Sequence, residues 1–139
     1  MFNKVLVAND GSGNAFKALE LAGRLVAQGG GELHVMVVEE VPEVVEIIGE
    51  VKEVKSAEDR QARAIIKRSE LIAGRMGVAI QAHVATGHVV RNIVDYATEG
   101  AFDLIVIGAT GHAALYERML GTRADRIAHL ARCPVLIAR

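Results

Sequence analysis

Short apolar stretches alternate with amphipathic stretches along the whole chain. The short stretches are rich in β-branched residues, and most of them lack a regular polar alternation. Strands of this kind are buried on both faces, as in a parallel sheet that is covered by helices. We therefore expect five strands, at residues 5–8, 33–38, 78–84, 104–107 and 135–137.

Between the expected strands lie segments whose apolar residues recur at i, i+3 and i+4, the pattern of a helix that covers a sheet. These segments are residues 15–26, 62–76, 89–97 and 124–131. Glycines follow the first three, where we expect a positive φ to end each helix, at Gly29 to Gly31, Gly77 and Gly100. The alternation predicts right-handed crossovers and an α/β fold, a doubly wound five-stranded parallel sheet with helices on both faces.

The segment of residues 39–59 departs from this rhythm, because acidic side chains dominate it and valines and isoleucines interrupt them. A charge-rich run is usually a solvated face. We therefore interpret the segment as a solvated, partly helical connection that leads into the second helix. A lid or a docking surface for a partner is the alternative.

Composition narrows the class of protein. The 139 residues suit a single domain, residues 1–139, and 51% hydrophobic residues exclude wholesale disorder. A formal net charge of −1 argues against a nucleic-acid binder. No apolar run approaches the roughly 20 residues of a membrane span or resembles a signal peptide, so we expect a cytoplasmic protein without membrane contact. The single cysteine, Cys133, excludes an internal disulfide, and the histidine spacing indicates no metal site.

Candidate chemistry gathers at the carboxyl ends of the expected strands, where open parallel sheets bind ligands. After the fourth strand the chain has the spacing Gly108-x2-Gly111-x9-Gly121-Thr122, which ends where the fourth helix begins. Glycines let backbone N–H groups approach a phosphate closely, and the start of a helix attracts anions. The spacing predicts a polyphosphate site with Thr122 as the helix N-cap. The alternative is that these glycines only turn the chain.

Charged residues near these strand ends add to the candidate site. His112, Arg118 and Arg123 are possible charge-assisted donors to a phosphate. Asp10, after the first strand, has two interpretations: its carboxylate binds ribose hydroxyls or helps hold a divalent cation, or it forms an Asx-type turn or cap before the first helix. We favour the ligand role, because both candidate sites lie at the same edge of the sheet.

Several segments together resemble one known family. Residues 5–12 and 103–108 look like its first and fourth strands, residues 133–137 look like its last strand, and the glycine–threonine spacing matches the ATP-binding motif of its nucleotide-binding branch. This family is that of the universal stress proteins, and the resemblance covers the whole chain. It implies a Rossmann-like, adenine nucleotide hydrolase-like sheet with strand order 3-2-1-4-5, and a homodimer that forms through the last strand.

The resemblance also implies roles for single residues. Asp10 would lie near the ribose and Val37 near the adenine. The residues expected around the phosphates are Gly108, Gly111, Gly121 and Thr122. Further candidate nucleotide contacts are Ala8, Thr110 and Arg123.

Three positions depart from the family pattern. Ala8 stands where the family often has proline and Asn9 where it often has an apolar residue, and both departures leave the contacts on the adenine side open. Ala124 stands where ATP-binding members frequently have a hydroxyl residue, and the charge of Arg123 is a possible replacement for that contact.

The expected function is that of a small ATP-binding protein in stress response or regulation, with Mg²⁺ beside the triphosphate. Hydrolysis requires a positioned water and neutralised charge. Since His112 is the only candidate base in the motif, we expect at most slow ATP hydrolysis. The alternative is a nucleotide-free dimeric interaction module of the same fold. An adenylating enzyme is disfavoured, because the expected serine-glycine-glycine loop is missing after the first strand.

Overall fold

The computed structural model describes residues 2–40, 48–109 and 120–139 of the chain. The strands are β1 (Lys4–Ala8), β2 (Glu32–Glu39), β3 (Ile80–Thr86), β4 (Leu104–Gly108) and β5 (Val135–Ala138). The helices are α1 (Gly13–Gly29), α2 (Ile48–Arg75), α3 (Val89–Glu99) and α4 (Thr122–Leu130). Within these described ranges, no helix is both long enough and apolar enough to cross a membrane.

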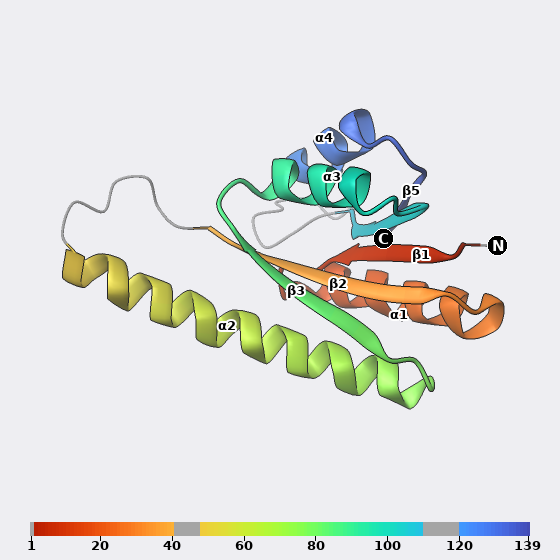
Figure 1. Ribbon diagram of the computed structural model, residues 1–139, viewed down its shortest axis with the longest axis horizontal. Helices are drawn as coiled ribbons and strands as arrows, with labels where there is room; N and C mark the ends of the chain where they lie inside the picture. Colours follow the sequence, from red (N-terminus) through yellow and green to blue (C-terminus); the bar gives the residue numbers. More distant parts are fainter. Residues whose placement is uncertain (1, 41–47, 110–119) are drawn as a thin grey trace.

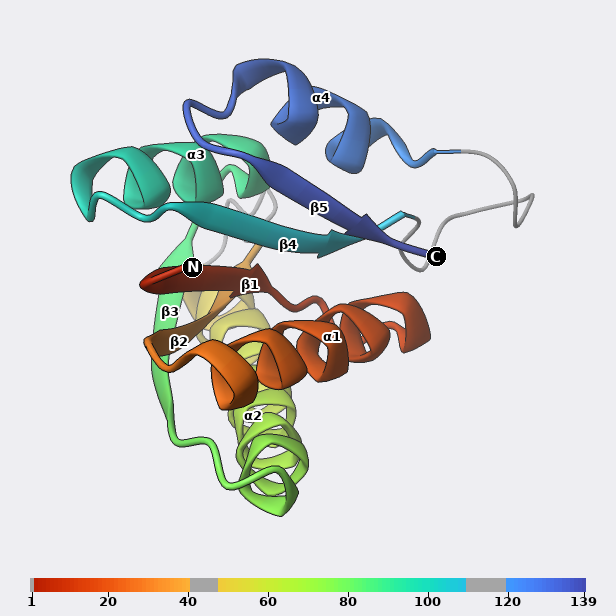
Figure 2. The same cartoon turned by 90° about the vertical axis from the view of Figure 1, so that its right-hand side faces the viewer.

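The strands form one sheet in the order β3-β2-β1-β4-β5, and every neighbouring pair is parallel. Helices α1 and α2 cover one face, and α3 and α4 cover the other (Figures 1 and 2). The chain leaves β1 toward β2 and later returns to its other side as β4, so the topological switch point lies between β1 and β4. The predicted fold class and strand order are confirmed.

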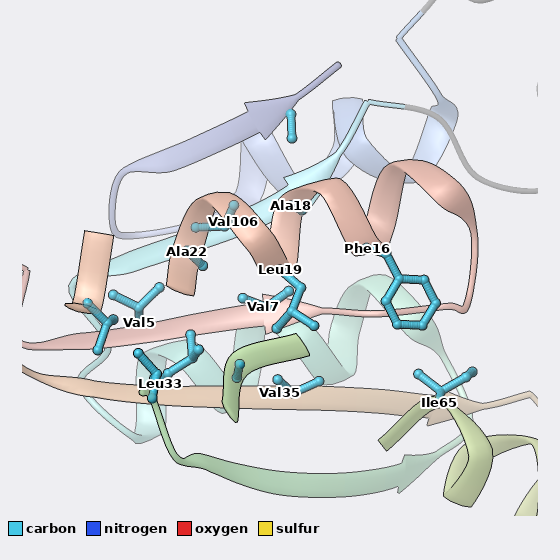
Figure 3. Packing of buried hydrophobic residues seen from close by; sticks show 14 of the residues in the cluster. Val5, Val7, Phe16, Ala18, Leu19, Ala22, Leu33, Val35, Ile65 and Val106 are labelled. Carbon is cyan, nitrogen blue, oxygen red and sulfur yellow. The ribbon is translucent and has the colours of Figure 1, made fainter. Parts of the chain in front are cut away.

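Side chains of the central strands point alternately into two apolar clusters, as the pleat of a strand requires. Val5 and Val7 of β1 pack in the cluster under α1 and α2, part of which Figure 3 shows, together with Leu19 of α1. Leu6, between the two valines, packs in the second cluster with Ile93 of α3. Because both faces are covered, the central strands are continuous apolar runs without polar alternation.

The predicted boundaries are wrong for two elements. β3 begins at Ile80 rather than at residue 78, because the Val78 N–H bonds to the Ala73 carbonyl in the turn that ends α2. α2 begins at Ile48, well before the apolar stripe that predicted a start near residue 62. The expected partly helical connection is therefore helical from residue 48, and residues 41–47 lie outside the described part.

Gly100 ends α3 as expected, but not by means of a positive φ. Its φ is −83°, and the next residue, Ala101, has the left-handed φ of 54°. A Cβ atom on Gly100 would lie 2.6 Å from the ring of Phe102. Glycine is needed here because the aromatic ring packs directly on the backbone, so the predicted reason is wrong.

Candidate functional site

The turn from β1 into α1 is fixed by its own buried side chain. Asn9 donates from Nδ2 to Ser69 Oγ of α2 at 3.1 Å, and its Oδ1 accepts the N–H of Gly11 at 2.9 Å. The Ser69 hydroxyl in turn donates to the Ile65 carbonyl at 2.8 Å. These bonds tie the carboxyl end of β1 to α2 and hold the residue after Asn9 at the edge of the sheet.

That residue is Asp10, and its carboxylate takes part in the local turn. Asp10 Oδ1 accepts the N–H of Ser12 at 2.9 Å, which makes an Asx-type turn. The cap of α1 is Ser12, whose Oγ accepts the N–H of Ala15 at 3.2 Å. The turn interpretation of Asp10 therefore holds, whereas its ligand role stays a prediction.

Gly108, the last residue of β4, packs against the beginning of α1. A Cβ atom at Gly108 would lie 2.8 Å from the backbone carbon of Asn14 and 3.0 Å from the nitrogen of Ala15. Only a residue without a side chain lets β4 and the first turn of α1 approach this closely. The packing explains this glycine by itself, so its expected phosphate contact stays a prediction.

The two ends of the glycine motif meet at the end of β4. The Gly121 N–H bonds to the Ala109 carbonyl, with a distance of 2.6 Å between nitrogen and oxygen. Gly121 is the N-cap of α4, with φ −64° and ψ 153°, and among the described residues no side chain caps the helix. The prediction of Thr122 as N-cap is wrong, because Thr122 is already the first helical residue. Thr110, Gly111, His112 and Arg118 lie outside the described residues.

Arg123, in the first turn of α4, forms an ion pair with Glu40, which follows β2. The two side chains are 52% and 57% exposed. Glu40 follows β2, and Arg123 belongs to α4, which leads into β5. Strands β1 and β4 lie between β2 and β5 in the sheet, so the ion pair crosses over the switch point. A phosphate bound at the start of α4 would compete with Glu40 for this guanidinium.

Ala8 and Val37 lie at the same edge, but Val37 turns away from the switch point. Its side chain is 4% exposed and packs in the cluster under α1 and α2, whereas Ala8 is half-buried beside the other cluster. Met36 accepts the N–H of Asn9 from the β1 side, and backbone groups of successive strand residues point to opposite sides. The backbone groups of Val37 thus point toward β3, and those of Val38 point past the end of β1.

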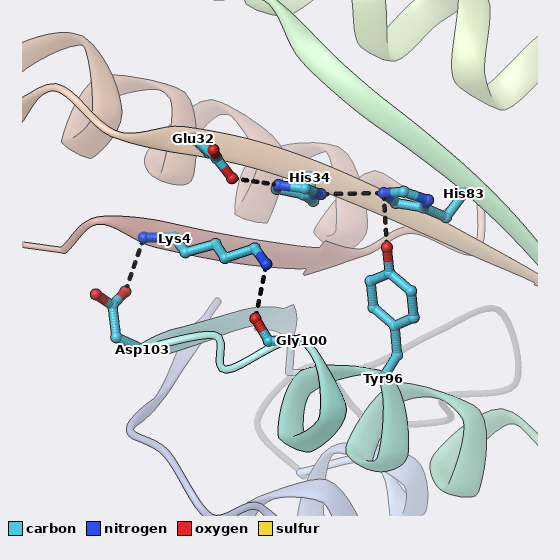
Figure 4. A network of polar contacts seen from close by, with 7 residues as sticks. All are labelled: Lys4, Glu32, His34, His83, Tyr96, Gly100 and Asp103. Atoms are coloured by element: carbon cyan, nitrogen blue, oxygen red, sulfur yellow. Dashed lines mark hydrogen bonds and ion pairs between the residues drawn. The ribbon is translucent and has the colours of Figure 1, made fainter.

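A chain of polar contacts crosses β2 and β3 on the face covered by α3 (Figure 4). His34 Nε2 lies 3.0 Å from a carboxylate oxygen of Glu32, and His34 Nδ1 lies 3.0 Å from His83 Nε2. The hydroxyl of Tyr96 in α3 lies 2.8 Å from the same nitrogen of His83. The bond to His34 lowers the pKa of Glu32. Burial, with the charges of His34 and Lys4 adding to it, lowers the pKa of His83.

The sequence analysis missed this histidine pair, because it tested spacing along single elements. The signal is the register between two strands: Met36 is opposite His83 and His34 is opposite Gln81, so the two histidines are diagonal neighbours on one face. Among the described residues, no three histidine, cysteine, aspartate or glutamate side chains are grouped as a metal site requires.

A model of the universal stress protein family matches residues 1–139. The chain belongs to the universal stress protein family. Universal stress protein YxiE of Bacillus subtilis is 33% identical to it, and the match covers 100% of both chains.

Solved structures of other universal stress proteins share the fold. UspA from Lactobacillus plantarum superposes with a TM-score of 0.90 at 22% identity, over 99% of this chain and 98% of that chain. A universal stress protein solved in complex with cAMP has a TM-score of 0.77 at 25% identity, over 99% and 97% of the two chains. The protein from Archaeoglobus fulgidus in complex with dAMP has a TM-score of 0.72 at 22% identity, over 99% and 98%. Some proteins of this fold therefore bind adenine nucleotides.

Proposed function

We propose that this universal stress protein binds ATP, with Mg²⁺, at the carboxyl edge of its sheet. The observation that carries the proposal is the bond from the Gly121 N–H to the Ala109 carbonyl. This bond brings the two halves of the glycine motif together beside the switch point, where open parallel sheets bind their ligands. The nucleotide complexes of related proteins add support, since their ligands also contain adenine.

The start of α4 offers the electrostatic part of this site. The first backbone N–H groups of a helix have no partner within it, and they carry the positive end of the helix dipole. Because no side chain in the described part of the chain caps α4, we assign these groups to the phosphates, together with the glycines of the motif. The phosphate contacts then comprise Gly108, Thr110, Gly111, Gly121, Thr122 and Arg123.

The ribose and adenine contacts follow from the strands on the other side of the switch point. Asp10, beside Ala8, is assigned to the ribose hydroxyls, with one oxygen already held by the Ser12 N–H. The adenine contact is better supplied by the backbone of Val38 than by Val37, since Val37 turns its backbone toward β3 and its side chain into the core.

Mg²⁺ usually keeps several waters and binds substrate phosphate oxygens, so we assign the cation to the phosphates and leave Asp10 with the ribose. The cation would shield the phosphate charge. We propose that ATP hydrolysis is at most slow.

Binding is tested by isothermal titration calorimetry with ATP and Mg²⁺ on the wild type and on Gly121→Val. The φ of −64° at Gly121 is open to any residue, so valine leaves the backbone conformation accessible. We expect binding to weaken at least about tenfold, or about 1.4 kcal/mol, because the side chain blocks the close approach of a phosphate. Gly74→Ala in α2, where a Cβ meets open space, is the matched control and keeps wild-type affinity.

Two results would contradict the proposal. A wild-type protein that neither retains nucleotide on purification nor binds ATP would be the nucleotide-free interaction module instead. Equal ATP affinity of Gly121→Val and the wild type would remove the phosphate contacts from the glycine motif.

We further propose that the protein is cytoplasmic and forms a homodimer through β5. The supporting observation for the dimer is that β5 ends the sheet, with Val135, Leu136 and Ile137 only partly buried. An apolar sheet edge is usually paired or covered.

A further inference from the structure

His34 of β2 and His83 of β3 face each other through two ring nitrogens that share a single hydrogen. His34 is 4% exposed, and its ring is nearly parallel to that of His83, at an interplanar angle of 9°. The facing nitrogens, His34 Nδ1 and His83 Nε2, are 3.0 Å apart. A contact of that length holds one hydrogen between two nitrogens, because two N–H groups would repel each other.

The neighbouring carboxylate fixes which nitrogen of His34 carries hydrogen. An ionised Glu32 only accepts hydrogen bonds, so His34 Nε2 must be the donor. When His34 is neutral, its Nδ1 is therefore bare and accepts the N–H of His83. When His34 is protonated, its Nδ1–H donates to a bare His83 Nε2, which the Tyr96 hydroxyl also approaches.

A second proton has no place in this geometry. It would have to bind His83 Nε2, where it would face the Nδ1–H of His34 and a second positive charge. The pair therefore exists as neutral or singly protonated while the rings stay in contact, and it becomes doubly protonated only when they separate.

The other charged groups around the pair do not relieve this restriction. From β1, Lys4 adds positive charge, and its ammonium group lies 4.6 Å from the centre of the Phe102 ring that abuts His34. Asp103, in the turn before β4, already accepts the backbone N–H groups of Asn3 and Lys4. From α3, Tyr96 contributes a neutral hydroxyl, and α2 covers the opposite face of the sheet. Of the side chains that the structure describes, only Glu32, on the far side of His34, offers negative charge directly to the pair.

We propose that His34 and His83 form a single-proton site, and that binding of a second proton separates the His83 side chain of β3 from His34 of β2. The device makes the β3 edge of the sheet sensitive to acid.

The direction of the pH effect follows from the proton count. In the unfolded chain both histidines bind a proton below about pH 6.5, whereas the folded pair binds one. A group whose pKa is lowered by folding, as that of His83 is, stabilises the fold above its unfolded pKa. This stabilisation is lost as the pH falls toward the folded pKa. Over that range the ratio of folded to unfolded protein falls by up to about tenfold per pH unit from this site alone.

The proton count is measured directly on the wild type by long-range ¹H–¹⁵N NMR of the imidazole rings, from about pH 8 to about pH 5. We expect His34 and His83 to take up one proton between them while the fold is intact. Further acidification should broaden or shift the amide signals of β3 and the ring signals of Tyr96. These changes should come before any change in the amide signals of β1 and β4. Two independent, full titrations without any change in β3 would overturn the proposal.

Urea unfolding across the same pH range provides the second test. We expect the stability of His83→Gln to fall less steeply with acid than that of the wild type. The difference should be up to about tenfold in the ratio of folded to unfolded protein per pH unit. His129→Gln on α4, whose side chain is 75% exposed, is the matched control and should keep the wild-type pH dependence. Parallel curves for the wild type and His83→Gln would show that the pair is no proton-limited site, and the NMR titration decides the matter if His83→Gln fails to fold.

Discussion

Single buried polar residues hold the carboxyl edge of this sheet in shape. Asn9 is 2% exposed, and its amide group makes one bond to α2 and one to its own turn. A buried amide that keeps its hydrogen-bond partners stabilises a fold modestly. Removal of the amide costs more free energy than the bond contributes, because the buried partners are then left without a hydrogen bond. The geometry around Asp10 therefore depends on Asn9, although Asn9 touches no proposed ligand.

Asn9→Ala should lower the free energy of unfolding by about 1–3 kcal/mol, because the Gly11 N–H and the Ser69 hydroxyl lose a partner. Urea unfolding at neutral pH measures the change. Ser69→Ala and the double variant complete a cycle in which we expect a coupling of roughly 1 kcal/mol. Additive effects of the two substitutions would mean that the bond from Asn9 to Ser69 contributes nothing to stability.

At this scale the sequence predicts residue types better than it predicts their roles. The Asx turn of Asp10 was an open alternative because Gly11 and Ser12 follow it, and the structure contains that turn. The N-cap of α4 was placed one residue too late, since threonine is the better capping residue by type but Gly121 is held by Ala109. Bonds between distant residues, such as this one, have no signature in local sequence.

This fold requires glycine where two elements pack so closely that a Cβ atom would meet backbone. Gly108 lets β4 lie against the first turn of α1, where a Cβ would meet backbone atoms. Gly23, in the middle of α1, has a different neighbour, the flexible end of the Met76 side chain. Backbone moves only with its whole element, whereas a methionine adopts another rotamer easily.

We therefore expect opposite outcomes from the same substitution at these two positions. Gly108→Ala should destabilise the protein by about 1–3 kcal/mol through overpacking. Gly23→Ala should be within about 1 kcal/mol of the wild type, since a better helix former offsets the displacement of Met76. Thermal and urea unfolding of both variants measure this contrast. An equally small effect at both positions would mean that the start of α1 yields to a side chain on β4.

At the scale of elements, burial explains which predictions were right. The central strands lie between two helical layers, so their unbroken apolar runs identified them and predicted the parallel sheet. The apolar stripe of α2 identified only the part of that helix that packs on the sheet. In Figure 1 the beginning of α2 extends beyond β3, and a helix outside the core needs no apolar stripe.

The five-stranded sheet of the whole molecule ends in two edge strands, β3 and β5, and they differ in character. β5 presents partly buried apolar residues, whereas β3 includes Gln81 and the histidine of the proton site. This difference favours β5 for pairing with a second copy and leaves the His83 side chain of β3 free to separate from His34 in acid. The pairing of strand edges depends on the assembled sheet, so the sequence alone offered it only through resemblance to a family.

Proline substitutions distinguish the two edges without breaking the sheet itself. Ala138 accepts the N–H of Ala109, and Pro134 accepts that of Ile105, so Ile137 points its own N–H away from β4. On β3 the N–H of Val84 likewise points outward, because that of Gly87 bonds to Glu39. Proline removes a backbone donor, so at these two positions it removes none of the bonds within the sheet.

Ile137→Pro should therefore convert the proposed dimer into a monomer of 14.8 kDa, while Val84→Pro should stay dimeric. Light scattering coupled to size-exclusion chromatography measures both masses, and circular dichroism checks that each variant is folded. The reason is that an edge strand recruits a second copy through its outward N–H and C=O groups. Proline removes one of these N–H donors and places its ring where the second strand would pair. A dimer that survives Ile137→Pro but dissociates with Val84→Pro would assign the interface to β3. The same contact would then restrain the strand that carries His83 and make the acid response of the proton site dependent on protein concentration.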